Sequence, residues 1–157
     1  MNKLNKIFLS ISLFLTPIFA YELNFDEYAT KAINVHPEKE QIKIRLNEYG
    51  TLKENLKHFS TMKKISMVNL FINQATHKLD EDGYGIDDYW ATPKEFLLNG
   101  YGDCEDFAIA KYFTLLELGI DKNDLYLANV IIKKKNESHM VLLYKDKKMK
   151  TPIIDAV

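Results

Sequence analysis

The feature that most constrains this chain is a nearly uninterrupted apolar stretch, residues 104–118, which begins at the only cysteine in the protein. Beyond its first turn, only Lys111, Thr114 and Glu117 interrupt it, and at helical spacing they fall on one narrow stripe. A helix that is apolar on most sides must be surrounded by other elements. We therefore expect a central helix over residues 104–118, ended by Gly119.

Helices are also expected before this central element. Apolar residues recur every three or four positions over residues 24–33, 38–57 and 61–75, and Ser60 is placed to cap the third segment. Thr92 is followed by a proline and, three positions after the cap, by a glutamate, which is typical of a short helix start. The N-terminal part of the domain is therefore predicted to be helical.

The spacing of apolar residues along the sequence changes from a helical to a strand pattern after Gly119. Branched and aromatic residues predominate over residues 125–132 and 138–144, with a polar turn between them, and residues 151–157 predict a third strand. Short connections favour antiparallel neighbours. Helices followed by an antiparallel β meander give an α+β fold, and 157 residues suffice for one such domain.

The first residues have the composition of a secretory signal peptide. Lys3 and Lys6 precede an apolar run over residues 7–15, and Ala20 supplies a small residue before a cleavage site. The run is short for a membrane span, so an uncleaved anchor is the weaker alternative. We expect cleavage near Ala20, which leaves an exported, periplasmic domain of residues 21–157 without stable membrane insertion. The formal net charge of −1 excludes an extended basic surface for nucleic acid.

The lone cysteine predicts nucleophilic catalysis. In an exported protein Cys104 has no internal disulfide partner, and the start of a helix stabilises a thiolate. The neighbouring acids Asp103, Glu105 and Asp106 would by themselves raise the pKa of the thiol. The site therefore requires a nearby cationic group, which can be an imidazolium, a metal ion or both.

His139 is the best candidate for the general base. It begins the second predicted strand, whereas the other three histidines fall in segments that we expect to be helical or at helix ends. Asp155, on the next predicted strand, could fix the orientation of the imidazole. The alternatives are a half-buried structural histidine and a carboxylate at a strand end.

The acids around Cys104 have two interpretations. Asp103, Glu105 and Asp106 suit the positive end of a helix dipole, which taken alone is the better explanation, and they also suit a hard cation such as calcium. Further oxygens could come from the 121–124 loop, if tertiary folding brings it near. Zinc is disfavoured, because one cysteine and one well-placed histidine are too few ligands. The acidic segment 80–93 fails the EF-hand pattern at Ala91, so we interpret residues 80–82 as a solvated loop.

The motifs around these residues resemble those of the bacterial transglutaminase-like cysteine peptidases, of the periplasmic type that cleaves adhesins. The similarity runs from about residue 69 to residue 155, and its most specific part is the Gly-Asp-Cys-Glu-Asp core with a downstream His-Met-Val. The segments that carry it are residues 68–73, 90–93, 95–97, 100–112 and 138–142.

This resemblance implies a papain-like, transglutaminase-like core and a Cys104–His139–Asp155 triad. It also implies that calcium binds through Asp103 and Glu105, with Asp106 as a further ligand. The expected function is that of a calcium-dependent cysteine endopeptidase.

The resemblance also implies a substrate and a partner. The substrate would be a large surface adhesin, cut near its N-terminus to control biofilm attachment, and an inner-membrane receptor for cyclic di-GMP would sequester the enzyme. Two other functions remain open: a catalytically weak copy that only binds adhesin or receptor, and a transglutaminase or amidase that acts on peptide crosslinks. The chain ends two residues after Asp155, where the family continues with more strand, so we expect a truncated and weakly held last strand.

Overall fold

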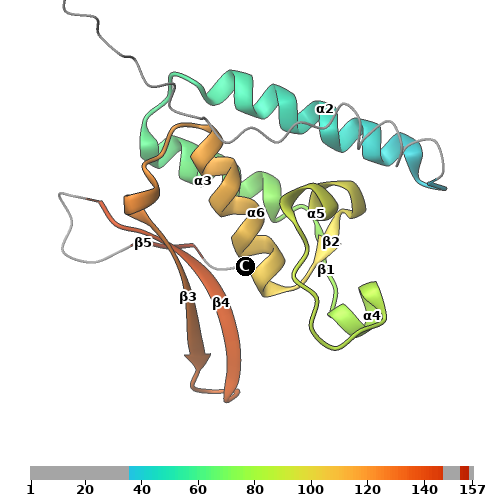
Figure 1. The fold of residues 1–157 in the computed structure, drawn as a ribbon. Helices are drawn as coiled ribbons and strands as arrows, with labels where there is room; N and C mark the ends of the chain where they lie inside the picture. The colour runs from blue at the N-terminus through green and yellow to red at the C-terminus, as the bar shows by residue number, and fades with distance from the viewer. Residues whose placement is uncertain (1–35, 147–152, 156–157) are drawn as a thin grey trace, which may run out of the picture.

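In the computed structural model, which describes residues 36–146 and 153–155, helix α6 (Cys104–Glu117) passes through the centre of the molecule. A three-stranded sheet packs on one side of it, and three helices pack on the other (Figure 1). The sheet consists of β3 (Leu125–Ile132), β4 (Glu137–Tyr144) and β5 (Ile153–Asp155), and the helices are α2 (Lys39–Leu56), α3 (Thr61–Ile72) and α5 (Pro93–Asn99). This arrangement confirms the predicted α+β fold with a central helix.

The core forms around α6 because nearly all sides of this helix are covered. Phe107, Ala110 and Leu115 are almost completely buried, and they pack against apolar residues of α3, α5 and β4. The polar stripe of the helix is covered as well, by α2. The Tyr49 hydroxyl donates a hydrogen bond to Glu117, and Lys53 forms a salt bridge of 3.1 Å with the same carboxylate. Among the described helices, none is both long and apolar enough to cross a membrane.

Local sequence signals set the helix boundaries. The Ser60 hydroxyl accepts the Lys63 amide at the start of α3. At the start of α5, Thr92 and Glu95 form a reciprocal capping box: the Thr92 amide donates to Glu95 at 2.8 Å, and the Glu95 amide donates to Thr92 at 3.3 Å. These helices are confirmed. The helix that we predict over residues 24–33 lies outside the described residues.

The sheet is the predicted antiparallel meander, with strand order β3-β4-β5. Strands β3 and β4 pair over their full length, from Leu125 opposite Tyr144 to Ile132 opposite Glu137. Strand β5 then pairs with the second half of β4 and places Asp155 opposite Leu142. Since β4 lies between two strands and packs on α6, it is the strand that joins the sheet to the central helix.

The structure corrects two interpretations of the segment before α5. Residues 80–82 are not a solvated loop, because α4 (Asp80–Tyr84) begins there and Asp80 is only 4% exposed. His77 is not at a helix end, because β1 (Thr76–His77) pairs in parallel with β2 (Tyr101–Gly102). Strands of two residues carry no detectable periodicity, so only the tertiary structure reveals this pairing.

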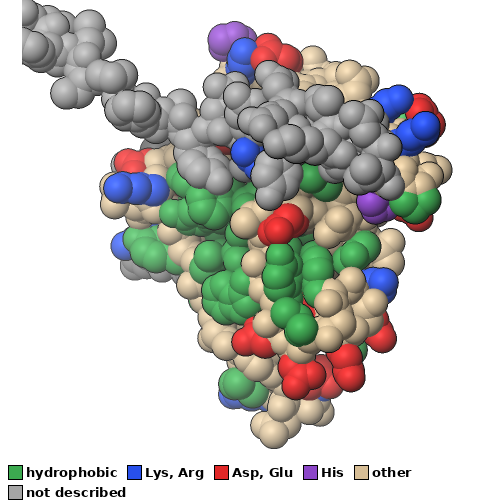
Figure 2. Space-filling view, turned by 45° about the vertical axis from the view of Figure 1, so that its right-hand side comes forward, with side chains coloured by type: hydrophobic (Ala, Val, Ile, Leu, Met, Phe, Trp, Pro, Cys, Tyr) green, Lys and Arg blue, Asp and Glu red, His purple; other side chains and the backbone are tan. Residues whose placement is uncertain are grey.

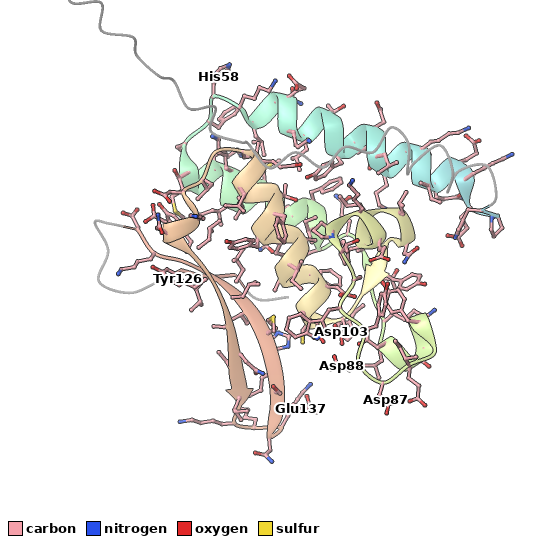
Figure 3. All side chains as sticks on the ribbon, viewed as in Figure 1. His58, Asp87, Asp88, Asp103, Tyr126 and Glu137 are labelled. Carbon is pink, nitrogen blue, oxygen red and sulfur yellow. The ribbon has the colours of Figure 1, made fainter. Side chains whose placement is uncertain are left out.

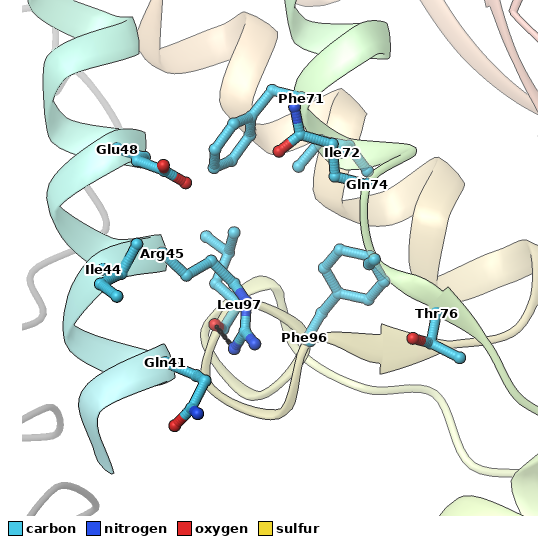
Figure 4. Close-up of a pocket in the computed structure, with 12 residues that line it drawn as sticks. Gln41, Ile44, Arg45, Glu48, Phe71, Ile72, Gln74, Thr76, Phe96 and Leu97 are labelled. Carbon is cyan, nitrogen blue, oxygen red and sulfur yellow. Dashed lines mark hydrogen bonds between the residues drawn. The ribbon is translucent and has the colours of Figure 1, made fainter. Parts of the chain in front are cut away.

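Arg45 joins α2 to the end of α5 (Figure 4). Its Nη1 atom donates to the carbonyl oxygens of Leu97 at 2.9 Å and Leu98 at 2.8 Å, which belong to the last turn of α5. Gly100 follows in the left-handed region, with φ of 72°, and packs under the guanidinium. The end of α5 thereby directs the chain into β2 and on to Cys104.

Candidate active site

Cys104 is the first residue of α6, as predicted, and its half-buried thiol lies against the sheet. The Met140 amide on β4 donates a hydrogen bond of 3.4 Å to Cys104 Sγ. The described part of β5 ends at Asp155, which pairs with Leu142 on β4. Met140 lies two residues before Leu142 on β4, beyond the end of β5. The residue before Met140 is His139, so the sheet brings this histidine to the start of the helix.

Cys104 and His139 line one cleft of about 510 Å³. Asp103 and Glu105 line it too, on the side of the helix. His77, Trp90 and the exposed Leu79 line the cleft as well, from the segment before α5. A cleft that combines exposed apolar side chains with a nucleophile and an imidazole is suited to hold a peptide segment near the thiol.

Burial, together with the neighbouring acids, disfavours ionisation of the Cys104 thiol by raising its pKa. Its Sγ donates to Glu105 Oε2 at 3.1 Å. Burial, with the neighbouring Glu105 and Asp103 carboxylates, raises the pKa of the Cys104 thiol to about 11, although the Met140 amide acts in the opposite direction. This agrees with the expectation that the acids disfavour a thiolate. Ionisation of the thiol therefore needs a base and added positive charge.

Three carboxylates meet behind the thiol. Ligand-type oxygens of Asp80, Asp103 and Asp106 all lie within 4.8 Å of one another. Asp80 Oδ1, Asp103 Oδ1 and Asp106 Oδ2 are buried and have no hydrogen-bond partner among the described residues. Burial and the neighbouring acids raise the pKa of Asp103 to about 7 and that of Asp106 to about 6. Buried carboxylate oxygens without donors are unfavourable, unless protons or a cation balance them.

A second group of acids shares Asp80. Asp80, Asp88 and Glu105 also place oxygens within 4.8 Å of one another. Figure 3 shows Asp88 near Asp103, and acidic side chains gather along the lower right of the face in Figure 2. Within the described residues, the 121–124 loop contributes no member to these groups, and Asp121 instead caps its own 3-10 turn. The fold therefore does not bring this loop to the acids, because the loop follows the far end of α6.

Gly102 allows the acids to approach one another. A Cβ atom at this position would lie 2.5 Å from Asp106 Oδ2 and 2.6 Å from Asp106 Cβ. Any side chain at position 102 would thus displace the carboxylate from the acidic group. The glycine before Asp103 is therefore a packing requirement of the site.

Asp155 lies on β5, which pairs with β4, the strand that carries His139, as predicted. Its backbone pairs with Leu142, three positions along β4 from His139. Its side chain lies outside what the structure describes. The pairing of the third strand with β4 is thus established, and the contact between the carboxylate and the imidazole stays a prediction.

Three residues of the site were missed from the sequence: Asp80, Asp88 and His77. The two aspartates belong to the polar segment rejected as an EF-hand, and nothing local distinguishes them from solvated acids. The signal available was the nearby Trp90-Ala91-Thr92-Pro93 motif, since a segment that carries a family motif seldom serves only as a linker.

Comparisons with known proteins show the family and the fold. Residues 38–155 match the family profile of the bacterial transglutaminase-like cysteine proteinases (BTLCP). An EGTA-treated structure of LapG from Legionella pneumophila is 31% identical, with a TM-score of 0.71 over 85% of this chain and 70% of that one. A calcium-bound structure of the same protein is 33% identical, with a TM-score of 0.69 over 83% of this chain and 71% of that one. A comparison with curated protein sequences gave no significant match.

Proposed function

Because the chain belongs to the bacterial transglutaminase-like cysteine proteinases, we propose that it is a calcium-dependent endopeptidase that uses Cys104 as its nucleophile. The observation that carries the proposal is the Cys104 thiol at the start of α6, hydrogen-bonded to the strand of His139 inside a cleft. The residue types and their placement suit acyl transfer.

The reaction follows from this placement. Cys104 Sγ attacks the scissile carbonyl carbon and forms a C–S bond, while the thiol proton passes to the His139 imidazole. The peptide C–N bond breaks, and His139 returns the proton to the departing amine. Water then adds to the thioester, the C–S bond breaks, and the carboxylic acid product leaves as the thiol is restored. N–H groups in the first turn of α6 have no acceptor within the helix, so they can stabilise the negative oxygen of each intermediate.

Asp155 is proposed as the third member of the triad. A carboxylate beside the imidazole holds the productive tautomer and stabilises the imidazolium. The support is that β5, which carries Asp155, pairs with β4, which carries His139. Because Asp155 lies opposite Leu142, an odd number of positions from His139, the role also requires the chain to turn toward the imidazole at the end of β5.

Calcium is proposed as the bound cation. Asp103, Glu105 and Asp106, with Asp80 added from α4, supply the oxygen ligands that calcium prefers. The buried oxygens without partners fit such an ion, since each lacks a hydrogen-bond donor. When bound, the cation would neutralise the acids beside Cys104 and favour the thiolate. One of the similar LapG structures is calcium-bound.

The substrate and location are proposed from the sequence. We infer export to the periplasm after loss of residues 1–20, cleavage of a large surface adhesin near its N-terminus, and hence control of biofilm attachment. An inner-membrane receptor for cyclic di-GMP is proposed as the partner that sequesters the enzyme. The open cleft beside Cys104 supports a protein substrate, because it can receive an extended chain.

The decisive test uses residues 21–157 and the N-terminal region of a surface adhesin from the same organism. We expect calcium-dependent cleavage into two products whose summed mass exceeds the substrate by one water. Cys104→Ala and His139→Ala should each lose activity by roughly a thousandfold or more. His58 is exposed and lies at the top of the molecule in Figure 3, away from Asp103, so His58→Ala is the matched control. Release of ammonia with crosslinking would favour a transglutaminase, and full cleavage by Cys104→Ala would refute the proposal.

A further inference from the structure

Trp90 is the only tryptophan in the chain, and it lines the cleft that holds Cys104 and His139. Its side chain is 56% exposed, although tryptophan usually buries more of its surface in a protein of this size. A large aromatic side chain that forms an open wall beside a nucleophile is suited to contact a peptide substrate.

The backbone on both sides of Trp90 is held by the buried acids. The Tyr89 amide donates to Asp80 Oδ2 at 2.6 Å, and the Ala91 amide donates to Asp106 Oδ1 at 2.7 Å. The second oxygens of these two carboxylates, Asp80 Oδ1 and Asp106 Oδ2, are the buried atoms without a partner among the described residues. Each carboxylate thus has one oxygen on an amide beside Trp90 and a second, buried oxygen that is left for the proposed cation.

The side chain of Trp90 is held by a third acid. Its Nε1–H donates to Asp88 Oδ1 at 3.0 Å, and Asp88 belongs to the second acidic group with Asp80 and Glu105. The tryptophan is therefore attached to the acidic residues at three points, two through its neighbours' amides and one through its own indole.

We propose that the cation bound by these acids sets the position of Trp90, and through it the affinity for substrate. This inference rests on the proposed function and adds the means by which the ion acts on the cleft. Asp80, Asp88 and Asp106 are positioning residues in this scheme, and Trp90 is the residue that touches the peptide. The chemistry points to a divalent cation of the calcium type, because the two groups of acids described above offer it carboxylate oxygens.

The physical reason is that the carboxylates are shared. Without the ion, buried oxygens of Asp80, Asp103 and Asp106 within 4.8 Å repel one another. Movement that relieves this repulsion also moves the amides of Tyr89 and Ala91, which follow their acceptors. With the ion, the same carboxylates are fixed, and Trp90 is held against the cleft. Calcium then improves the binding of substrate in addition to its effect on the thiol.

The first experiment uses tryptophan fluorescence, since one tryptophan reports one position. Calcium is titrated into calcium-free residues 21–157, and emission and anisotropy are compared with heat from a parallel calorimetric titration. We expect the emission spectrum to shift and the anisotropy to rise until both saturate. The midpoint of these changes should be the calcium concentration at which the calorimetric titration has its midpoint. Calcium binding with unchanged emission and anisotropy would overturn the inference and leave the proposed function standing. Absence of binding heat would overturn both. This measurement needs no substrate.

The second experiment compares two neighbouring aspartates. Asp88→Ala removes the acceptor of the indole, whereas Asp87→Ala removes an exposed acid outside both groups, farther from Asp103 in Figure 3. We expect Asp88→Ala to reduce the fluorescence response by at least about half and to raise KM about fivefold, with kcat within about twofold. Trp90→Ala should raise KM at least as much, and Trp90→Phe less. Equal KM values for Asp88→Ala and Asp87→Ala, or an unchanged KM in Trp90→Ala, would refute the role of Trp90.

Discussion

Replacement of Gly100 by alanine tests how α2 supports the active-site segment. Gly100 has φ of 72°, which disfavours any residue with a Cβ atom. A Cβ placed there would lie 2.2 Å from Arg45 Nη2 and 2.3 Å from Arg45 Cζ. Since such distances are impossible, the guanidinium must leave its place, and its hydrogen bonds to Leu97 and Leu98 are lost.

The expected magnitude is the sum of two terms. The left-handed backbone costs a residue with a Cβ about 1 kcal/mol. A hydrogen bond from a charged donor contributes about 1.5–3 kcal/mol. Arg45 is only half-buried, so water replaces part of both bonds, and we take about 2 kcal/mol for the pair. Gly100→Ala should therefore lower the free energy of unfolding by about 3 kcal/mol.

Urea unfolding in saturating calcium measures this change, and the chain offers a matched control. Gly119 has φ of 80°, but a Cβ there would meet no atom within 4 Å, so Gly119→Ala should cost about 1 kcal/mol. In an Arg45→Ala background the clash is absent, and Gly100→Ala should then also cost about 1 kcal/mol. If the effects of Gly100→Ala and Gly119→Ala agree within about 0.5 kcal/mol in the unaltered background, the contact with Arg45 has no energetic weight.

Three further predictions concern the cation site, a helix cap and the last strand. Burial raises the pKa of Asp103 to about 7 and of Asp106 to about 6 in the calcium-free protein. Because these protons must leave before a cation binds, calorimetry should show that the affinity for calcium rises at least roughly tenfold from pH 5.5 to pH 8. A calcium affinity that does not change with pH would exclude both acids as ligands. Thr92→Ala removes the cap of α5 and should cost about 1 kcal/mol in urea unfolding, whereas an effect below about 0.3 kcal/mol would show that water replaces the cap. Hydrogen exchange should be faster at residues 153–155 of β5 than at residues 107–116 of α6, because a three-residue strand has few ladder bonds; equal protection would show that the short strand is already secure.

Patterns within short stretches of the sequence were sufficient to predict most of the helices and strands. The apolar stretch from Cys104 predicted a central helix, and the capping box at Thr92 predicted α5, because helix burial and capping depend on residues only a few positions apart. The change to branched residues after Gly119 predicted the β meander for the same reason.

The site was only partly accessible to this reasoning. Cys104 and His139 could be proposed from residue type and position, and the structure places both in one cleft. Asp80 and Asp88 could not be distinguished from solvated acids, since their role depends on the approach of α4 and its following loop to the start of α6.

The sequence by itself determined the main helices and strands and the candidates for the reactive residues, because both follow from local patterns and from side-chain chemistry, whereas α4 and the β1–β2 pair were not predicted. Only the tertiary structure decided which carboxylates meet and which residues they hold. Asp80 and Asp106 are 26 residues apart in the sequence, yet their carboxylates place oxygens within 4.8 Å of each other, and each carboxylate accepts one of the two amides beside Trp90. Such contacts depend on packing between distant segments, which no periodicity or motif within one segment encodes.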